Sequence, residues 1–276
     1  MPPFPAKPVY MGLAHKRPRG GERFKMSIAI ALVALASFTA GFINALAGGG
    51  SFLTLPALIA AGVPPIAANA SSTVALFPGQ IATGVSARDG IRAAAKDHRI
   101  NVPALAAISL VGGLIGGLLL LVTPASLFAR IIPWLILFAT LVFAFGNALH
   151  PDSARFRLNR TGVLITQGLI AVYGGYFGGG IGILMLAGLT LYGLRDIWLM
   201  NSLKILLAVL MNAAAVVTFI IAGLVHWKLT IIAGIAAIIG GYVGIHAARR
   251  LPQSVVKAFV IVVGLVLTVY FFVKAA

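Results

Sequence analysis

The stretch GFINALAGGGSFLTLPAL, residues 41–58, decides how this chain folds, because three consecutive glycines interrupt an otherwise apolar run. Glycine weakens a helix and adopts backbone conformations closed to other residues, so Gly48-Gly49-Gly50 predicts a break between two helical segments. The apolar run behind the break, about residues 52–62, is roughly half the length of the ~20 residues that cross a bilayer. The stretch therefore predicts a helix, an unwound backbone and a half-length helix.

The composition of the whole chain indicates that these segments lie in lipid. Of 276 residues, 60% are hydrophobic and 9% are charged, and the mean hydropathy is +1.04. Soluble domains carry roughly 25% charged residues, so this chain could not coat a soluble surface. The predicted fold is an all-α polytopic membrane protein with about 8 long hydrophobic segments. The apolar segments lie at about 27–47, 52–62, 66–86, 101–122, 127–148, 161–177, 183–193, 197–222, 228–246 and 254–273.

The interrupted unit occurs twice. A second triplet, Gly178-Gly179-Gly180, follows the first at an offset of 130, and Asn201 follows Asn69 at 132. These offsets predict two homologous repeats, each with a glycine-broken helix, a half-helix and three further spans. We expect a basic N-terminal tail at 1–25, a first transmembrane repeat at 26–148, a polar connector at 149–160 and a second transmembrane repeat at 161–276.

The orientation of the two repeats depends on the path of the half-helices. If each half-helix returns to the side from which its broken helix came, a repeat makes three crossings and the repeats are inverted. If it crosses, a repeat makes four crossings and the repeats are parallel. Lys and Arg concentrate on the cytoplasmic side of membrane proteins. When the basic tail is left out, their distribution favours inverted repeats with the connectors 87–100 and 149–160 in the cytoplasm. The parallel arrangement stays open, because it places the basic tail in the cytoplasm as well.

The few charged residues also limit the classes of function. The net charge is +16, but most basic residues lie in the tail or the connectors, where they fit anionic lipid headgroups better than nucleic acid. The chain has no cysteine, and its acids lie outside the spans, at Glu22, Asp89, Asp97, Asp152 and Asp196. No metal cluster, carboxylate pair or catalytic triad is recognisable, so we expect neither an enzyme nor a metal or cofactor.

The two glycine breaks predict an anion site. A half-helix that starts after a break directs its positive N-terminal end and free N–H groups into the membrane interior. Ser51 would add a hydroxyl to the first site, and Asn44 stands one turn before it. The alternative for the glycines is close helix packing, and the alternative for Asn44 is capping of the broken helix.

Polar side chains continue into the segment after each half-helix. Helical spacing places Asn69, Ser72 and Thr73 on one face, whereas hydrogen bonding between helices is the alternative role. Lys204 is the one ammonium group well inside a predicted span, and no acid is available there to pair with it, so it is expected to bind an anion. The predicted substrate-binding residues are Asn44, Gly48, Gly49, Gly50, Ser51, Asn69, Ser72, Thr73, Gly178, Gly179, Gly180, Asn201, Ser202 and Lys204.

These motifs resemble the sulfite exporter TauE/SafE family of membrane transporters. The resemblance covers about residues 27–273 and rests on the stretch 41–58 and on ANASSTVA at 68–75, YFGGGIG at 176–182, MNSLK at 200–204 and GGYVG at 240–244. It implies a duplicated plasma-membrane protein that exports small sulfur-containing or organic anions, such as sulfite, sulfoacetate or related sulfonates.

The function predicted from the residues and this resemblance is a secondary transporter or facilitator of small anions that works by alternating access. An anion channel would share the same binding groups and is the first alternative. A membrane enzyme or assembly subunit that does not transport, in which the polar stripes only hold helices together, is the second. The sequence leaves both a monomer and a homo-oligomer open.

Overall fold

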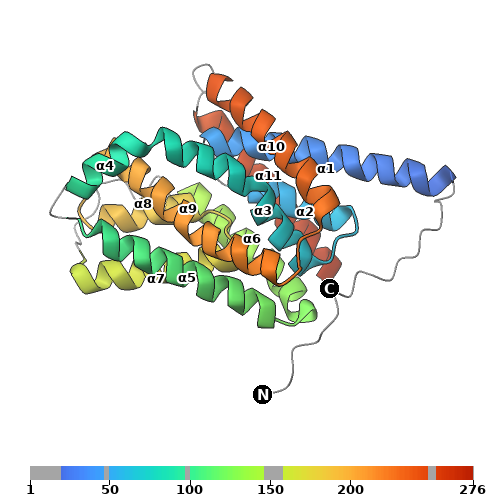
Figure 1. Cartoon of the computed structure of the whole chain (residues 1–276). Helices are drawn as coiled ribbons and strands as arrows, with labels where there is room; N and C mark the ends of the chain where they lie inside the picture. The colour runs from blue at the N-terminus through green and yellow to red at the C-terminus, as the bar shows by residue number, and fades with distance from the viewer. Residues whose placement is uncertain (1–19, 47–49, 97–99, 146–157, 248–252, 276) are drawn as a thin grey trace.

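The computed structural model describes residues 20–46, 50–96, 100–145, 158–247 and 253–275, and this part of the chain is helical with no strand (Figure 1). The helices are α1 (Gly20–Leu46), α2 (Ser51–Ala60), α3 (Pro65–Ser86), α4 (Arg88–Lys96), α5 (Val102–Val122), α6 (Ala125–Phe145), α7 (Arg160–Tyr176), α8 (Ile181–Leu191), α9 (Ile197–Ile221), α10 (Trp227–Ala247) and α11 (Gln253–Ala275). Because α1 begins at Gly20, its first turns lie inside the segment predicted as a tail.

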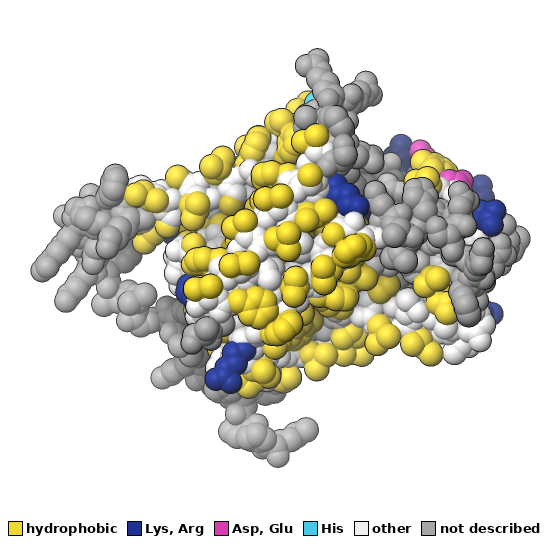
Figure 2. All heavy atoms as spheres, turned by 180° about the vertical axis from the view of Figure 1, so that it is seen from behind, with side chains coloured by type: hydrophobic (Ala, Val, Ile, Leu, Met, Phe, Trp, Pro, Cys, Tyr) yellow, Lys and Arg dark blue, Asp and Glu magenta, His cyan; other side chains and the backbone are white. Residues whose placement is uncertain are grey.

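The expected all-helical membrane fold is confirmed. Among the described residues, 6 helices are long and apolar enough to cross a bilayer: α1, α5, α6, α9, α10 and α11. The other two long segments of the prediction form α3, which carries many polar residues, and α7, which has 17 residues. Large apolar side chains such as Val122, Leu169 and Ile221 are exposed, and Figure 2 shows such side chains covering the middle of one face. This surface matches a lipid environment.

Polar residues fix where several helices begin. The Asn101 side chain accepts the N–H of Ala104 at the start of α5, and Asp196 accepts the N–H groups of Trp198 and Leu199 at the start of α9. A side-chain acceptor at this position satisfies an N–H that has no partner within the helix. These caps follow polar connectors, so the helices start where the chain enters the apolar layer.

Helix α4 lies within the connector expected at 87–100, for which no helix was predicted. It exposes Arg88, Asp89 and Arg92, and it buries Gly90 and Ala94. A Cβ atom on Gly90 would lie 2.0 Å from Ser202 Oγ, so α4 packs directly on the beginning of α9. The short helix therefore covers one end of the bundle, which we call the α4 end.

The recurring glycine motifs pack helices from different halves of the chain together. A Cβ atom on Gly116 of α5 would lie 2.1 Å from the Val172 carbonyl oxygen of α7, and one on Gly240 of α10 would lie 1.9 Å from the Phe38 carbonyl oxygen of α1. Side chains at these positions would collide with backbone. Each broken helix, α1 or α7, is therefore held against a helix from the other half of the chain.

The chain path brings both half-helices back to the end where their broken helices begin. At the α4 end, α7 starts and α8 stops, and the Leu158 N–H donates to the Leu191 carbonyl at 2.9 Å. Helix α1 starts at the opposite end, and α2 leads into α3, which runs from that end to α4 (Figure 1). Helices α3 and α9 run in opposite directions beside each other, because Gly84 lies against Val209 while Gln80 bonds to Asn212.

Candidate functional site

The second glycine break is a defined turn between α7 and α8. Gly178 and Gly180 have φ angles of +82° and +74°, a left-handed conformation that favours glycine strongly over other residues. The Tyr173 hydroxyl donates to the Gly179 carbonyl at 2.8 Å, and the Phe177 N–H donates to the Tyr173 carbonyl at 2.9 Å. The second triplet therefore interrupts the helix as its composition predicts.

The start of α8 presents backbone donors at this break. The N–H groups of Ile183 and Leu184 both donate to the Gly180 carbonyl, at 3.2 and 3.3 Å. Within the described chain, the N–H groups of Gly179, Gly180, Ile181 and Gly182 donate to no backbone carbonyl. Free N–H groups at a helix N-terminus carry partial positive charge and favour an anion.

Lys204 of α9 lies beside these donors. Its Cδ atom is 3.6 Å from the point that a Cβ atom on Gly182 would occupy, so the lysine stem runs along the first turn of α8. The side chain is half-buried, and the described residues contain no hydrogen-bond or ion-pair partner for it. The stem of a lysine without a carboxylate partner thus adjoins the positive end of a half-helix.

The equivalent position in the first half holds Ser72, at the offset of 132. Ser72 is buried, and its hydroxyl hydrogen-bonds that of Thr54 in α2. Positions 72 and 204 therefore each contact the half-helix of their own half of the chain, the first through a hydroxyl pair and the second through a lysine side chain. This difference makes the second half-site the more suitable one for an anion.

The first glycine break is described in part. Gly48 and Gly49 lie outside the described residues, whereas Gly50 is buried and precedes α2. A Cβ atom on Gly50 would lie 2.5 Å from the Ala40 carbonyl oxygen, so the start of α2 folds back against α1. Ser51, the first residue of α2, is half-buried.

Asn69 connects α3 to the second break. Its side chain is 2% exposed, and its Nδ2 atom donates to the carbonyl oxygen of Tyr176, the last residue of α7, at 2.9 Å. The neighbouring Thr73 donates to the Asn69 carbonyl within its own helix at 3.0 Å. Asn69, Ser72 and Thr73 therefore make three separate contacts, and only Asn69 reaches a glycine break of the other repeat.

Three further predicted residues line a cleft. Asn44, Asn201 and Ser202 contribute to a cleft of about 680 Å³ between α1, α3, α9 and α10. Asn201 is exposed, while the Ser202 hydroxyl donates to the Trp198 carbonyl at 2.9 Å. The cleft lies toward the α4 end, because its α3 residues come from the second half of that helix and its α9 residues from the beginning. Lys204 lies between the cleft-lining residues Asn201 and Ile205 but turns toward α8.

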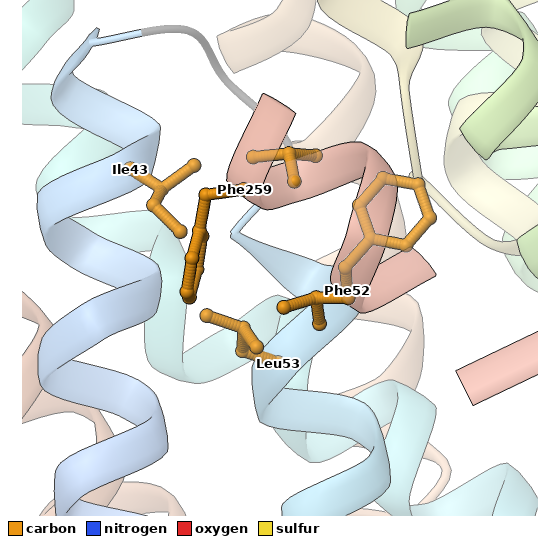
Figure 3. Close-up of a pocket in the computed structure, with 6 residues that line it drawn as sticks. Ile43, Phe52, Leu53 and Phe259 are labelled. Atoms are coloured by element: carbon orange, nitrogen blue, oxygen red, sulfur yellow. The ribbon is translucent and has the colours of Figure 1, made fainter. Parts of the chain in front are cut away.

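A second hollow lies where α1, α2 and α11 meet, and Figure 3 shows its side chains. Ile43, Phe52, Leu53 and Phe259 converge there, and the space between them cannot hold a water molecule. Its lining is apolar throughout. These side chains therefore pack the half-helix α2 against α11 and offer an anion no hydrogen-bond donor.

One polar pair was not among the predicted site residues. Nδ2 of Asn212 in α9 donates to Oε1 of Gln80 in α3 at 2.8 Å. The two positions are 132 residues apart, the same offset that relates Asn201 to Asn69. The shared offset of 132 was therefore the sequence signal that could have paired them.

Comparison with known proteins identifies the family of the chain. The family model described as "Sulfite exporter TauE/SafE" matches residues 33–271. The chain belongs to the TauE/SafE family. It is accordingly a multi-pass membrane transporter, as the resemblance in its motifs implied.

Several curated relatives of this TauE/SafE protein are named as probable transporters. "Probable membrane transporter protein ORF9" of Sinorhizobium sp is 29% identical over 243 residues, covering 87% of this chain and 91% of the relative. "Probable membrane transporter protein" of Haemophilus influenzae is 27% identical, with 88% of this chain and 95% of the relative covered. "Probable membrane transporter protein YfcA" of Escherichia coli K12 is 28% identical, with coverages of 83% and 84%. No solved structure matches the chain.

Proposed function

We propose that this TauE/SafE transporter is a secondary transporter or facilitator that exports small sulfur-containing or organic anions, such as sulfite and sulfonates, across the plasma membrane. The observation that carries the proposal is the position of Lys204 beside the free N–H groups at the start of α8. An oxyanion has several acceptor oxygens, so it can accept backbone N–H bonds and an ammonium bond at once. The other predicted ligands, Asn44, Asn201 and Ser202, would guide the anion along the cleft.

The repeats are, in this proposal, inverted, with the α4 end in the cytoplasm. The return of each half-helix to its starting end supports three crossings per repeat. Apart from those in the first turns of α1, the described basic residues are concentrated at the α4 end. At that end lie Arg88, Arg92, Lys96, Arg160, Arg195 and Lys257; at the opposite end lie Arg130, Lys228 and Lys274, together with Arg23 and Lys25 at the start of α1. The cleft then opens to the cytoplasm, where a substrate for export is loaded.

Transport driven by the membrane potential or by the substrate gradient fits the chain better than proton coupling through a carboxylate. All five acids lie outside the predicted spans: Asp89 and Asp196 lie at the α4 end, and Glu22 lies in the first turn of α1. A carboxylate relay needs acids within the membrane. Efflux of a monovalent anion is favoured by a negative interior potential, which supplies roughly 2.3 kcal/mol per charge at 100 mV.

Counterflow into proteoliposomes tests the proposal directly. Liposomes loaded with unlabelled sulfite, sulfoacetate or taurine would accumulate the matching labelled compound through the native protein, with saturation. Lys204→Ala should lose saturable accumulation while purifying normally. Lys228→Ala is the matched control, because it removes an exposed ammonium at the start of α10 and should transport like the native chain. Unchanged affinity and rate in Lys204→Ala would refute this site, and flux without counterflow would indicate a channel.

A further inference from the structure

Two equivalent asparagines of the repeats have different environments. Asn69 is buried and donates to the Tyr176 carbonyl at the end of α7. Asn201, 132 positions later, is exposed in the cleft and has no hydrogen-bond partner in the described part of the chain. The same type of side chain is therefore buried and bonded in the first half of the chain, and exposed and, among the described residues, unbonded in the second half.

The equivalent partner of Asn201 can be identified from the glycine triplets. Tyr176 stands two residues before Gly178, so the offset of 130 makes Leu46 its counterpart, two residues before Gly48. Leu46 is the last residue of α1, as Tyr176 is of α7. The carbonyl groups in the last turn of a helix lack partners within that helix. Asn44, in the same turn, lines the cleft together with Asn201, so the end of α1 and Asn201 lie on its walls.

The surrounding helices have the same asymmetry. Ala82 of α3 is exposed and lines the cleft, whereas its counterpart Ala214 of α9 is half-buried. Between the two halves, Gln80 and Asn212 bond to each other across α3 and α9. A rocking motion about this contact would close the cleft beside Ala82 and open the corresponding space beside Ala214.

We propose that Asn69 and Asn201 are positioning residues that alternate: Asn69 holds the end of α7 while the cleft is open, and Asn201 holds the end of α1 when the cleft is closed. In the second state the Asn69–Tyr176 bond is broken and the opposite end of the bundle opens. A single hydrogen bond between membrane helices is weak, so thermal motion can exchange it. This inference rests on the proposed alternating access, and it assigns the two asparagines to the conformational step and not to the charge that binds the anion.

Cysteine labelling without substrate tests the exchange, because the chain has no native cysteine. Ala82→Cys reports on the open cleft and Ala214→Cys on its closed counterpart, and a membrane-impermeant maleimide is applied to vesicles of both orientations. Adding Asn69→Ala removes the bond of the open-cleft state, so the labelling rate of Ala82→Cys should fall several-fold and that of Ala214→Cys should rise. Adding Asn201→Ala should instead raise the labelling rate of Ala82→Cys and lower that of Ala214→Cys.

The control is Thr268→Val, which removes a hydrogen bond within α11 and should change neither rate. Asn201 is exposed, so Asn201→Ala has no buried bond to lose and tests the exchange even if Asn69→Ala folds poorly. Shifts in the same direction for both asparagine variants, or no shift with Asn201→Ala, would overturn the proposal. If opposite shifts occur while Lys204→Ala still transports, the exchange holds and the assigned anion site is wrong.

Discussion

The amides of Asn212 and Gln80 meet at 2.8 Å between α9 and α3, at positions that the two repeats share. Their helices run in opposite directions, and the helices on either side carry the two glycine breaks. The contact is therefore the point where the two halves touch through equivalent residues, and it is suited to remain in place while the surroundings rearrange.

Replacing either partner of this contact should destabilise the protein. Gln80→Leu or Asn212→Leu leaves one amide without its partner, at a cost of about 0.6 kcal/mol on average for hydrogen bonds between membrane helices and up to about 1.7 kcal/mol. The double variant should lose less stability than the sum of the two single losses, because each single variant already removes the hydrogen bond between the two amides. Thermal unfolding in detergent measures the cycle, and strict additivity would show that the amides do not interact.

Alanine substitution should have opposite effects on stability at two glycines, Gly240 in α10 and Gly79 in α3. Gly240→Ala would place a Cβ atom 1.9 Å from the Phe38 carbonyl oxygen, so α10 must separate from α1 and the folded yield should fall. Gly79→Ala meets nothing within 4 Å and should be neutral or stabilising by about 1 kcal/mol. Size-exclusion profiles and melting temperatures compare the two variants. Equal tolerance would contradict the close packing of α1 against α10.

Filling the cleft should block transport without unfolding the protein. Gly79 lines the cleft with open space at its Cβ position, so Gly79→Leu projects an isobutyl group into the proposed substrate path. We expect Gly79→Leu to melt like Gly79→Ala but to lose most of its counterflow, with larger sulfonates affected more than sulfite. Full activity of the leucine variant for every substrate would exclude this cleft as the path.

Single cysteines should label from the sides that inverted repeats require. Lys96→Cys in α4 and Lys257→Cys in α11 should react from the cytoplasmic side, and Lys228→Cys and Lys274→Cys from the other. Each site lies near a helix end, where an impermeant reagent has access. Labelling of Lys96→Cys and Lys257→Cys from opposite sides would establish the parallel arrangement instead.

Much of the fold follows from local composition, because lipid burial demands long apolar helices and glycine triplets interrupt them. Contacts between the repeats were harder to predict. The offset of 132 predicts that Asn69 and Asn201 are equivalent, but not that Asn69 reaches Tyr176 in the other half of the chain. Helix α4 was not predicted, because its nine residues lie in a charged connector and gain their stability by packing on α9.

The glycine packing of α5 on α7 and of α10 on α1 makes the two halves mutually dependent. A chain carrying only one half would have its broken helix without the surface that supports it. If the repeats are inverted, as proposed, such a chain could complete the same packing only by pairing with a second copy inserted in the opposite direction. The protein would then carry within one polypeptide an arrangement that a single repeat could reach only as a dimer of dual topology.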